Sequence, residues 1–291
     1  MDRANGCDGQ TAPFRAEATR CAGFAAASAT IATCGIAVMA KASAPGLTKT
    51  RLVPPLTHDE AASLNTAFLQ DVTGNMLLAA RHAPPHATIA AYAAYGPPGS
   101  EEFFRRNLPD SIGLISAWLP TFGECLLHTI REILVRGHAS AVVLNADSPT
   151  LPTALLNETA EILARPGERA VLGPSSDGGY YLLGLKTAHP RMFEDIEWST
   201  ERVAEQTRAR AREIGLELHL LPLWYDVDDG ETLCRLRGEL AAGEQARAAL
   251  NPPHARPHYP SHTAALLHRL RPNGDFSSGR QAIPQIEQAA V

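Results

Sequence analysis

The stretch that most constrains the fold runs from Ala141 to Leu151 and reads Ala-Val-Val-Leu-Asn-Ala-Asp-Ser-Pro-Thr-Leu. A run of small and β-branched apolar residues ends on one carboxylate, Asp147, and a Ser-Pro turn and a helix start follow it. Continuous apolar strands are typical of parallel sheets that are covered on both faces. The pattern therefore predicts a buried parallel strand that places Asp147 at the carboxyl edge of a sheet, where open α/β sheets bind their ligands. The alternative is that Asp147 only caps the following helix.

Strands and helices alternate along residues 35–242. Apolar runs predict further strands at 35–40, 87–93, 170–174, 180–185 and 216–221. Apolar stripes at helical spacing predict helices at 57–76, 122–134, 155–163, 200–214 and 231–242, the first of them after a Thr57–Glu60 capping box. This alternation predicts the α/β class, a single Rossmann-like domain with a mostly parallel sheet flanked by helices.

We place this domain at residues 34–245. Residues 1–33 show no clear periodicity and are expected to be a loosely ordered extension. Residues 246–291 are rich in Pro and His and are expected to form a poorly ordered tail, with a short helix near 263–270.

Composition and charge exclude several classes of partner. The chain has 291 residues, 45% of them hydrophobic, and a formal net charge of −5. This charge gives no electrostatic reason to expect nucleic acid as a partner. The chain contains no run of 18 apolar residues, so no membrane span is expected. The five cysteines are scattered and lack CxxC spacing, which speaks against a zinc site or a disulfide framework and suits the reducing cytoplasm. A homodimer is left open.

A basic loop follows the first predicted strand. Residues 41–52 place Lys41, Gly46, Lys49, Thr50 and Arg51 where backbone amides and cations could bind phosphates. The loop contains neither a Walker GxxxxGK[ST] motif nor a GxGxxG fingerprint. The alternative is a solvated basic loop without a ligand.

Two carboxylates separated by one residue occur late in the chain, at Asp226 and Asp228. Alternation along an extended segment would put both on one face, and such oxygen ligands suit Mg²⁺ or Mn²⁺. Together with Asp147 they form the predicted metal site. The alternative is an acidic helix N-terminus, which favours negative charge through the helix dipole.

Two further stretches are candidates for substrate contact. Asp177-Gly178-Gly179-Tyr180 joins two predicted strands, and its glycines would let the backbone approach a ligand. Trp198-Ser199-Thr200 precedes a predicted helix. The alternatives are an ordinary Gly-Gly turn and a hydrophobic anchor before an N-cap residue.

Taken in order, these stretches resemble a bacterial family of glycosyltransferase-like proteins in the nucleotide-diphospho-sugar transferase superfamily, some of them linked to arsenosugar biosynthesis. The family is also similar to 2-phospho-lactate guanylyltransferase and to molybdenum-cofactor nucleotidyltransferases. The matching stretches are AKASAPGLTKTRL at 40–52, VVLNADSPTL at 142–151, VLGPSSDGGYYLLGL at 171–185, WST at 198–200 and YDVDDGETL at 225–233. The resemblance implies the GT-A fold.

The resemblance also implies roles for individual residues. Lys49 and Arg51 match the basic pair of a phosphate-binding loop, and Asp147 matches a metal-binding aspartate. Asp177 lies in the turn that borders the acceptor, and the late acidic pair can complete metal binding. We expect Asp147, Asp177 and Lys49 to take part in catalysis.

The chain departs from the family pattern in three places, one of them Asp229-Gly-Glu231, where the family has Thr-Pro-Glu. Asn145 stands where a DxD site would have its other acid. The family stretch Gly-Asp-Leu-Gly-x-Arg appears here as Pro120-Thr-Phe-Gly-Glu-Cys125, without its Asp and Arg.

Three functions are weighed. The first is a metal-dependent glycosyltransferase that uses a nucleotide-diphospho-sugar donor and a small-molecule acceptor, with the metal as Lewis acid. The second is a nucleotidyltransferase, guanylyltransferase-like, that transfers NMP from an NTP to a small phosphorylated substrate. The third is a non-catalytic nucleotide-binding relative. The glycosyltransferase is placed slightly ahead.

Overall fold

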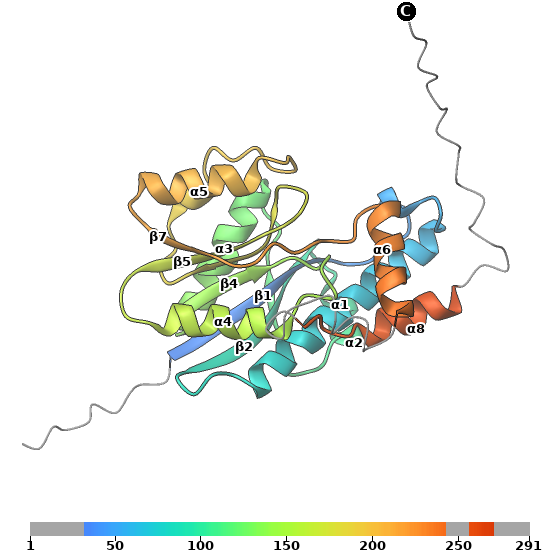
Figure 1. Cartoon of the computed structure of the whole chain (residues 1–291), viewed down its shortest axis with the longest axis horizontal. Coiled ribbons are helices and arrows are strands. Elements are labelled where there is room, and N and C mark those ends of the chain that lie inside the picture. The colour runs from blue at the N-terminus through green and yellow to red at the C-terminus, as the bar shows by residue number, and fades with distance from the viewer. Residues whose placement is uncertain (1–31, 243–255, 271–291) are drawn as a thin grey trace, which may run out of the picture. The chain divides into compact units, whose positions relative to one another are not determined.

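The computed structural model describes residues 32–242 and 256–270. Seven strands of these residues form one sheet in the order β3-β2-β1-β4-β6-β5-β7 (Figure 1). The strands are β1 Ala32–Lys41, β2 Ala87–Gly96, β3 Gly113–Ser116, β4 Ser140–Leu144, β5 Arg169–Pro174, β6 Tyr180–Leu185 and β7 Glu217–Leu220. All neighbouring pairs are parallel except those of β6, which lies antiparallel between β4 and β5. The predicted α/β fold class is confirmed.

Helices cover both faces of this sheet (Figure 1). They are α1 His58–Arg81, α2 Glu101–Asn107, α3 Phe122–Val135, α4 Thr153–Ala164, α5 Val203–Glu213, α6 Gly230–Ala241 and α8 Ser261–Arg269. The side chains of β1 alternate between two cores: Ile36 and Val38 pack with α1 and α4, whereas Ala37 packs with α3 and α5. A strand covered on both faces has to be apolar throughout, which is the pattern that β1 and β4 show.

Local signals account for several helix boundaries. The Thr57 hydroxyl accepts from the Glu60 amide at 3.2 Å and the Glu60 carboxylate accepts from the Thr57 amide at 2.7 Å, so the predicted capping box is confirmed. Thr121 and Glu124 form a second box at the start of α3. Gly137 follows α3 with a φ of +91°, a left-handed conformation that favours glycine.

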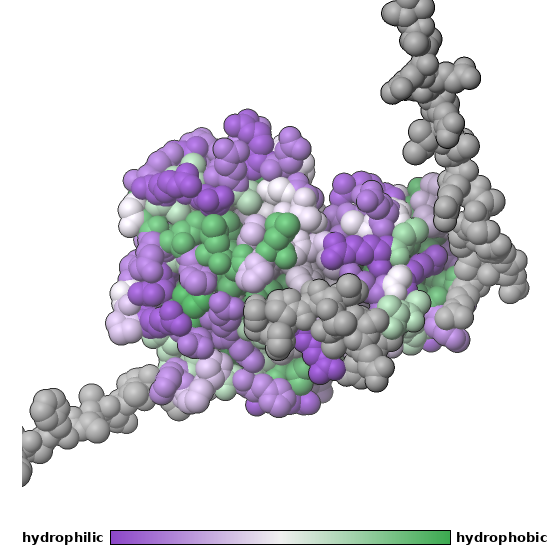
Figure 2. Space-filling model, viewed as in Figure 1, coloured by the Kyte–Doolittle hydropathy of each residue, from purple (hydrophilic) through white to green (hydrophobic). Residues whose placement is uncertain are grey.

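The edge strand β3 was not predicted. It has only four residues, Gly113–Ser116, and pairs with β2 alone. So short a run gives almost no periodicity, and its place in the sheet is fixed by the neighbouring strand. At the opposite edge, hydrophobic residues gather over β5 and β7 between the hydrophilic surfaces of α4 and α5 (Figure 2). Leu220 and Leu223 are 43% and 62% exposed there.

The helix α8 lies where a short helix was expected near 263–270, and it packs against the domain. Its Leu266 and Leu267 are buried in a third core with Phe68 of α1 and Leu236 of α6. The Asp71 carboxylate on α1 accepts from the backbone amides of His262 and Thr263 at 2.9 and 2.8 Å. Residues 256–270 are therefore part of the folded unit, while 1–31, 243–255 and 271–291 lie outside the described residues.

Among the residues that the structure describes, no helix is long and apolar enough to cross a membrane.

Candidate functional site

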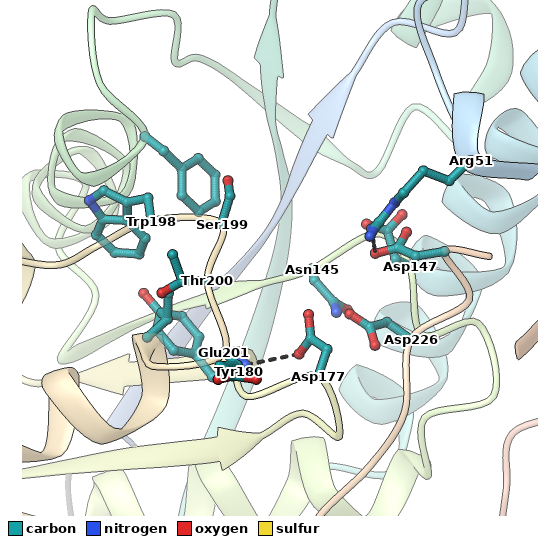
Figure 3. A pocket seen from close by; sticks show the side chains of 14 residues that line it. Arg51, Asn145, Asp147, Asp177, Tyr180, Trp198, Ser199, Thr200, Glu201 and Asp226 are labelled. Atoms are coloured by element: carbon teal, nitrogen blue, oxygen red, sulfur yellow. Dashed lines mark hydrogen bonds and ion pairs between the residues drawn. The ribbon is translucent and has the colours of Figure 1, made fainter.

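A cavity of about 620 Å³ opens at the carboxyl edge of β1 and β4 and beside the β5–β6 turn (Figure 3). Parallel strands bring their C-terminal ends to the same edge, and the loops that follow them form the walls. The lining residues are Arg51, Phe122, Asn145, Asp147, Asp177, Gly179, Tyr180, Trp198, Ser199, Thr200, Glu201, Val203, Asp226 and Asp228.

Asp147 reaches this cavity because β4 is rigid and buried. All five residues of β4 are buried, and the Asn145 amide continues the pairing by donating to the Tyr181 carbonyl at 2.9 Å. The Asp147 carbonyl accepts from the Val227 amide at 2.8 Å, which ties it to the late acidic segment. The next helix, α4, has Pro152 as its N-cap residue, so Asp147 does not cap it.

Lys49 occupies the position between two of the predicted metal ligands. Its Nζ lies 2.6 Å from Asp147 Oδ1 and 2.7 Å from Asp228 Oδ1, and it donates to the Val227 carbonyl at 2.8 Å. The Lys49 side chain is only 5% exposed. Burial lowers the pKa of Lys49, but the two carboxylates outweigh this effect and raise it, so the ammonium stays charged.

The rest of the basic loop lies closer to solvent. Arg51 Nη2 lies 2.9 Å from Asp228 Oδ2, and the Arg51 side chain is 71% exposed. Lys41 is exposed at the end of β1, with its Nζ 5.7 Å from the centre of the Trp118 ring. A smaller cavity of about 260 Å³ is lined by Lys41, Lys49, Thr50, Arg51, Asp147 and Asp228, among others. Gly46, with a φ of +73°, makes the turn of the loop but does not line either cavity.

Asp226 carries a charge that no described cation neutralises directly. It accepts from the Ser175 hydroxyl at 3.0 Å. Burial, and then the charges of Asp177 and Asp228, raise the pKa of Asp226 to about 6. The alternative of an acidic helix N-terminus applies to Asp229, which is the N-cap of α6, and not to Asp226 or Asp228.

The predicted metal trio is not assembled in this structure. Within 32–242 and 256–270, no group of three or more His, Cys, Asp or Glu side chains is arranged to hold a metal ion. The reason is that the Lys49 ammonium spans Asp147 and Asp228, while Asp226 is turned toward Ser175. The assignment of Asp147, Asp226 and Asp228 as metal ligands stays a prediction.

The β5–β6 turn contributes Asp177, Gly179 and Tyr180 to the cavity. The Gly179 amide donates to Asp177 Oδ1 at 2.8 Å and so fixes that carboxylate. Gly178 has a φ of +88°, and a Cβ atom there would lie 2.0 Å from the Glu201 carbonyl oxygen. Gly178 is therefore required by the packing of the following loop, and its expected contact with a ligand stays a prediction.

The loop before α5 forms the far wall with aromatic residues. The rings of Trp198 and Phe122 lie 5.3 Å apart, and those of Trp198 and Tyr180 lie 6.5 Å apart. Ser199 has a left-handed φ of +65°, and Thr200 donates its hydroxyl to the Glu197 carbonyl at 2.7 Å. The N-cap of α5 is Arg202, so neither Ser199 nor Thr200 caps it.

Phe122 is one of the cavity residues that the sequence did not predict, together with Asn145, Glu201 and Val203. Its place in an apolar helical stripe indicates a core position, yet it is 50% exposed and lines the cavity. The signal that could have revealed it is the Thr121–Glu124 capping box, which makes Phe122 the first residue of α3. Helical side chains tilt toward the N-terminus of the helix, so the side chain of its first residue can reach the loops that precede it.

Residues 79–200 match a sequence family described as an uncharacterized protein conserved in bacteria, DUF2064. The structure also matches that of a provisionally described nucleotide-diphospho-sugar transferase from Desulfovibrio desulfuricans G20, at 27% identity and a TM-score of 0.65. That match covers 81% of this chain and 94% of the other. The fold is that of the nucleotide-diphospho-sugar transferases.

Two further structures match at lower similarity. One is CMP:2-keto-3-deoxy-manno-octonic acid synthetase complexed with CTP, at 11% identity and a TM-score of 0.46, with 72% of this chain and 99% of that chain covered. The other is a cytidylyltransferase from Leptospira borgpetersenii, at 11% identity and a TM-score of 0.42, with coverage of 82% and 94%. Both are too dissimilar to bear on function. A search of curated proteins finds no match to this chain.

Proposed function

We propose that this protein is a metal-dependent glycosyltransferase that moves a sugar from a nucleotide-diphospho-sugar to a small neutral acceptor. The proposal is supported by the fold and by the similarity, over most of both chains, to the Desulfovibrio protein of that description. The choice of this reaction over nucleotidyl transfer rests on the uneven distribution of charged side chains along the cavity.

Cations are confined to one end of the cavity. Of the described residues that line the 620 Å³ space, Arg51 is the only Lys or Arg, and it is paired with Asp228. The neighbouring 260 Å³ cavity adds Lys41 and Lys49. Phosphate groups bind where cations and amide donors are available, so the nucleotide diphosphate belongs at this end.

A phosphorylated second substrate would find no cation at the other end. There the described lining consists of Phe122, Tyr180, Trp198 and uncharged or acidic neighbours. Placing a phosphate among carboxylates such as Glu201 costs free energy through like-charge repulsion. An acceptor with a neutral hydroxyl group fits this wall better.

The donor atoms of the site suit a hard divalent cation. They are carboxylate and amide oxygens, which Mg²⁺ and Mn²⁺ prefer. The Asn145 Oδ1 is buried beside the cavity and has no hydrogen-bond partner. Burial and neighbouring carboxylates raise the pKa of Asp226, and a bound cation would stabilise its negative charge. The residues that would hold it are Asp147, Asp226 and Asp228.

Such a cation would supply Lewis-acid stabilisation of the departing nucleoside diphosphate. The chain's own residues supply the other catalytic functions. Lys49 and Arg51 offset phosphate charge. The Asp177 carboxylate, held by the Gly179 amide, accepts the proton of the acceptor hydroxyl. Because both ends belong to one cavity, the bound donor and acceptor lie close together.

A nucleotidyltransferase is the second candidate. It is favoured by the three cations Lys41, Lys49 and Arg51 in one loop, which suit the higher charge of a triphosphate. It would require its phosphorylated acceptor to bind at the cation-free end of the cavity.

The two reactions release different products, so one assay separates them. The full-length protein is incubated with Mg²⁺ or Mn²⁺ and with panels of nucleotide-sugars and nucleoside triphosphates, each with candidate acceptors. We expect nucleoside diphosphate from a nucleotide-sugar. Pyrophosphate released from a triphosphate in an acceptor-dependent manner, with no diphosphate from any nucleotide-sugar, would reject the glycosyltransferase.

A further inference from the structure

The cavity is divided into two chemically different halves (Figure 3). Arg51, Asp147 and Asp226 lie at one side of the view, and Trp198, Tyr180 and Thr200 lie at the other, with Asp177 between them. The charged half accounts for a nucleotide and a cation. The aromatic half lies away from the cations that would bind phosphate, and under the proposed function it is the half that meets the second substrate.

Phe122 presents apolar surface that the protein itself does not cover. Its ring contacts Trp198 edge-on, with 5.3 Å between centroids and 85° between planes, yet half of the residue remains exposed at the cavity. A single exposed apolar residue needs no explanation, but here two further aromatic side chains line the same wall. Adjacent aromatic rings in a concave site are the usual means of binding a ring with an apolar face.

Tyr180 adds a polar group that is buried without a partner. Its hydroxyl oxygen has almost no solvent-accessible surface and makes no hydrogen bond to any described residue. Tyr180 lines the cavity, but this oxygen is covered by protein, so the residue offers a ligand its ring and not its hydroxyl group.

A small, mostly apolar space adjoins the main cavity beside Phe122. It measures about 170 Å³ and shares Phe122, Asn145, Asp147 and Tyr180 with the main cavity. Its other walls include Met39, Leu126 and Val143. An apolar cavity of about 150 Å³ is large enough to hold one benzene molecule. The volume therefore suits a single ring beside Phe122.

We infer that the acceptor of the proposed glycosyl transfer is an uncharged alcohol built on one ring, bound with an apolar ring face against Phe122 and Trp198. This inference rests on the proposed function and names the class of its second substrate. Phe122 is thereby assigned as a specificity-determining residue.

In the transfer step, the acceptor hydroxyl oxygen forms a bond to the anomeric carbon of the donor sugar. The bond between that carbon and the diphosphate oxygen breaks, and its electron pair leaves with the nucleoside diphosphate. The hydroxyl proton passes to the Asp177 carboxylate, which lies between the two halves (Figure 3).

The test measures binding of small probes to the full-length protein by saturation-transfer NMR and titration, without a donor. The ring probes are benzyl alcohol and methyl glucopyranoside, and the comparison probes are sorbitol and glycerol 3-phosphate. We expect the ring probes to bind and the comparison probes to bind at least tenfold more weakly. Equal binding of all four, or tighter binding of glycerol 3-phosphate, would overturn the inference.

Two variants locate the binding. Phe122→Ser should weaken the ring probes at least tenfold, while Val135→Ser, at an 83% exposed apolar position of the same helix, should leave them unchanged. Unchanged affinities in Phe122→Ser would place the probes elsewhere and reject this subsite.

The result of this binding test can be distinguished from the result of the turnover assay that tests the proposed function. Turnover of a nucleotide-sugar without ring-probe binding at Phe122 would reject only the acceptor class. Ring-probe binding at Phe122, together with triphosphate turnover that leaves nucleotide-sugars intact, would reject the glycosyltransferase while keeping the subsite.

Discussion

At the scale of single residues, Lys49 decides how charge is balanced in the cavity. Its ammonium offsets Asp147 and Asp228, and Arg51 adds a second cation to Asp228. Asp177 and Asp226 are left without such a partner among the described residues. A divalent cation that binds Asp147 and Asp228 would have to take the place of Lys49, which would then be free to contact phosphate.

Replacing Lys49 with Met should therefore reveal the metal site. Removing one member of a buried ion pair typically costs about 3–5 kcal/mol, and because Asp147 and Asp228 are 33% and 27% exposed we expect a smaller loss, about 2–3 kcal/mol. Added Mg²⁺ should restore part of this loss, since it would neutralise the same two carboxylates. Urea denaturation with and without Mg²⁺ measures both effects.

The exposed Lys41→Met variant is the control for Lys49, and it should change stability little. A Lys49→Met protein that keeps full stability and ignores Mg²⁺ would contradict this account of the site.

Replacing Asp147 with Asn should abolish metal-dependent nucleotide binding and leave the fold intact. The side chain is 33% exposed and caps no helix, so its charge serves the cavity more than the fold. Isothermal titration with a nucleoside diphosphate and Mg²⁺, beside thermal unfolding, measures the two properties. The exposed Asp110→Asn variant should bind like the parent protein. Unchanged binding by Asp147→Asn would remove Asp147 from the metal site.

At the scale of elements, the aromatic wall depends on how the β5–β6 turn packs against the loop before α5. The Ala204 amide donates to the Gly178 carbonyl at 2.9 Å, and the Glu201 backbone fills the space beside Gly178. This contact fixes the relation between Asp177 on the turn and Trp198 on the loop, although the two segments are separate in the sequence.

Gly178→Ala should disturb this contact. A Cβ atom would lie 2.0 Å from the Glu201 carbonyl oxygen, so the loop would have to move. Gly215 is a matched control, because its φ is also positive, +65°, and nothing lies within 4 Å of an added Cβ. We expect Gly178→Ala to lose at least about 1 kcal/mol more of unfolding free energy than Gly215→Ala. Equal losses would mean that the positive φ alone, and not packing, requires glycine.

The docking of α8 makes a second prediction about elements. Asp71 accepts from two backbone amides in the first turn of α8, His262 and Thr263, and is only 2% exposed. Asp71→Ala leaves these first-turn amides without an acceptor, and loss of a cap of this kind typically costs about 1–2 kcal/mol. Chemical denaturation should show this loss, whereas Asp110→Ala at an exposed position should not. A stability equal to the parent would mean that α8 does not depend on Asp71.

At the scale of the whole molecule, the site is assembled from segments that meet only after folding. Lys49 and Asp228 are separated by 179 positions in the sequence. The third core, which includes Leu52, Phe68, Tyr225 and Leu267, holds the basic loop and the acidic segment against α1 and α8. Substitutions that weaken the packing of α8 are therefore expected to disturb the nucleotide end of the cavity as well.

Overall stability should also depend on pH through His258. The His258 amide donates to the Thr150 carbonyl at 3.1 Å, and burial lowers the pKa of His258 despite the opposing charge of Asp71. The folded state then binds this proton less readily than the unfolded state, whose histidine pKa is about 6.5. The contribution of His258 is constant above pH 6.5 and becomes destabilising as the pH falls toward the folded-state pKa.

Urea denaturation between pH 5 and 8 checks the sign of this contribution. In the His258→Gln variant the fall in unfolding free energy below pH 6.5 should be smaller than in the parent. Parallel curves for the two proteins would remove His258 as a source of the pH dependence.

The sequence by itself determined the features that depend on neighbouring residues. The apolar run at 141–144 specified a buried strand, and the Thr57–Glu60 box specified the start of α1. Asp147 could be placed at a sheet edge because strand direction alone decides which end of a parallel strand faces the ligand. The expected basic loop and the Asp226–Asp228 pair also border the same site.

Only the tertiary structure decided which groups face one another. It placed Lys49 between Asp147 and Asp228, exposed Phe122 at the cavity, assigned Gly178 to loop packing and seated α8 on α1. The physical reason is the distance along the sequence over which each effect acts. Propensity, capping and apolar periodicity act over a few residues, whereas charge pairing and side-chain exposure depend on segments that are distant in the chain until they pack together.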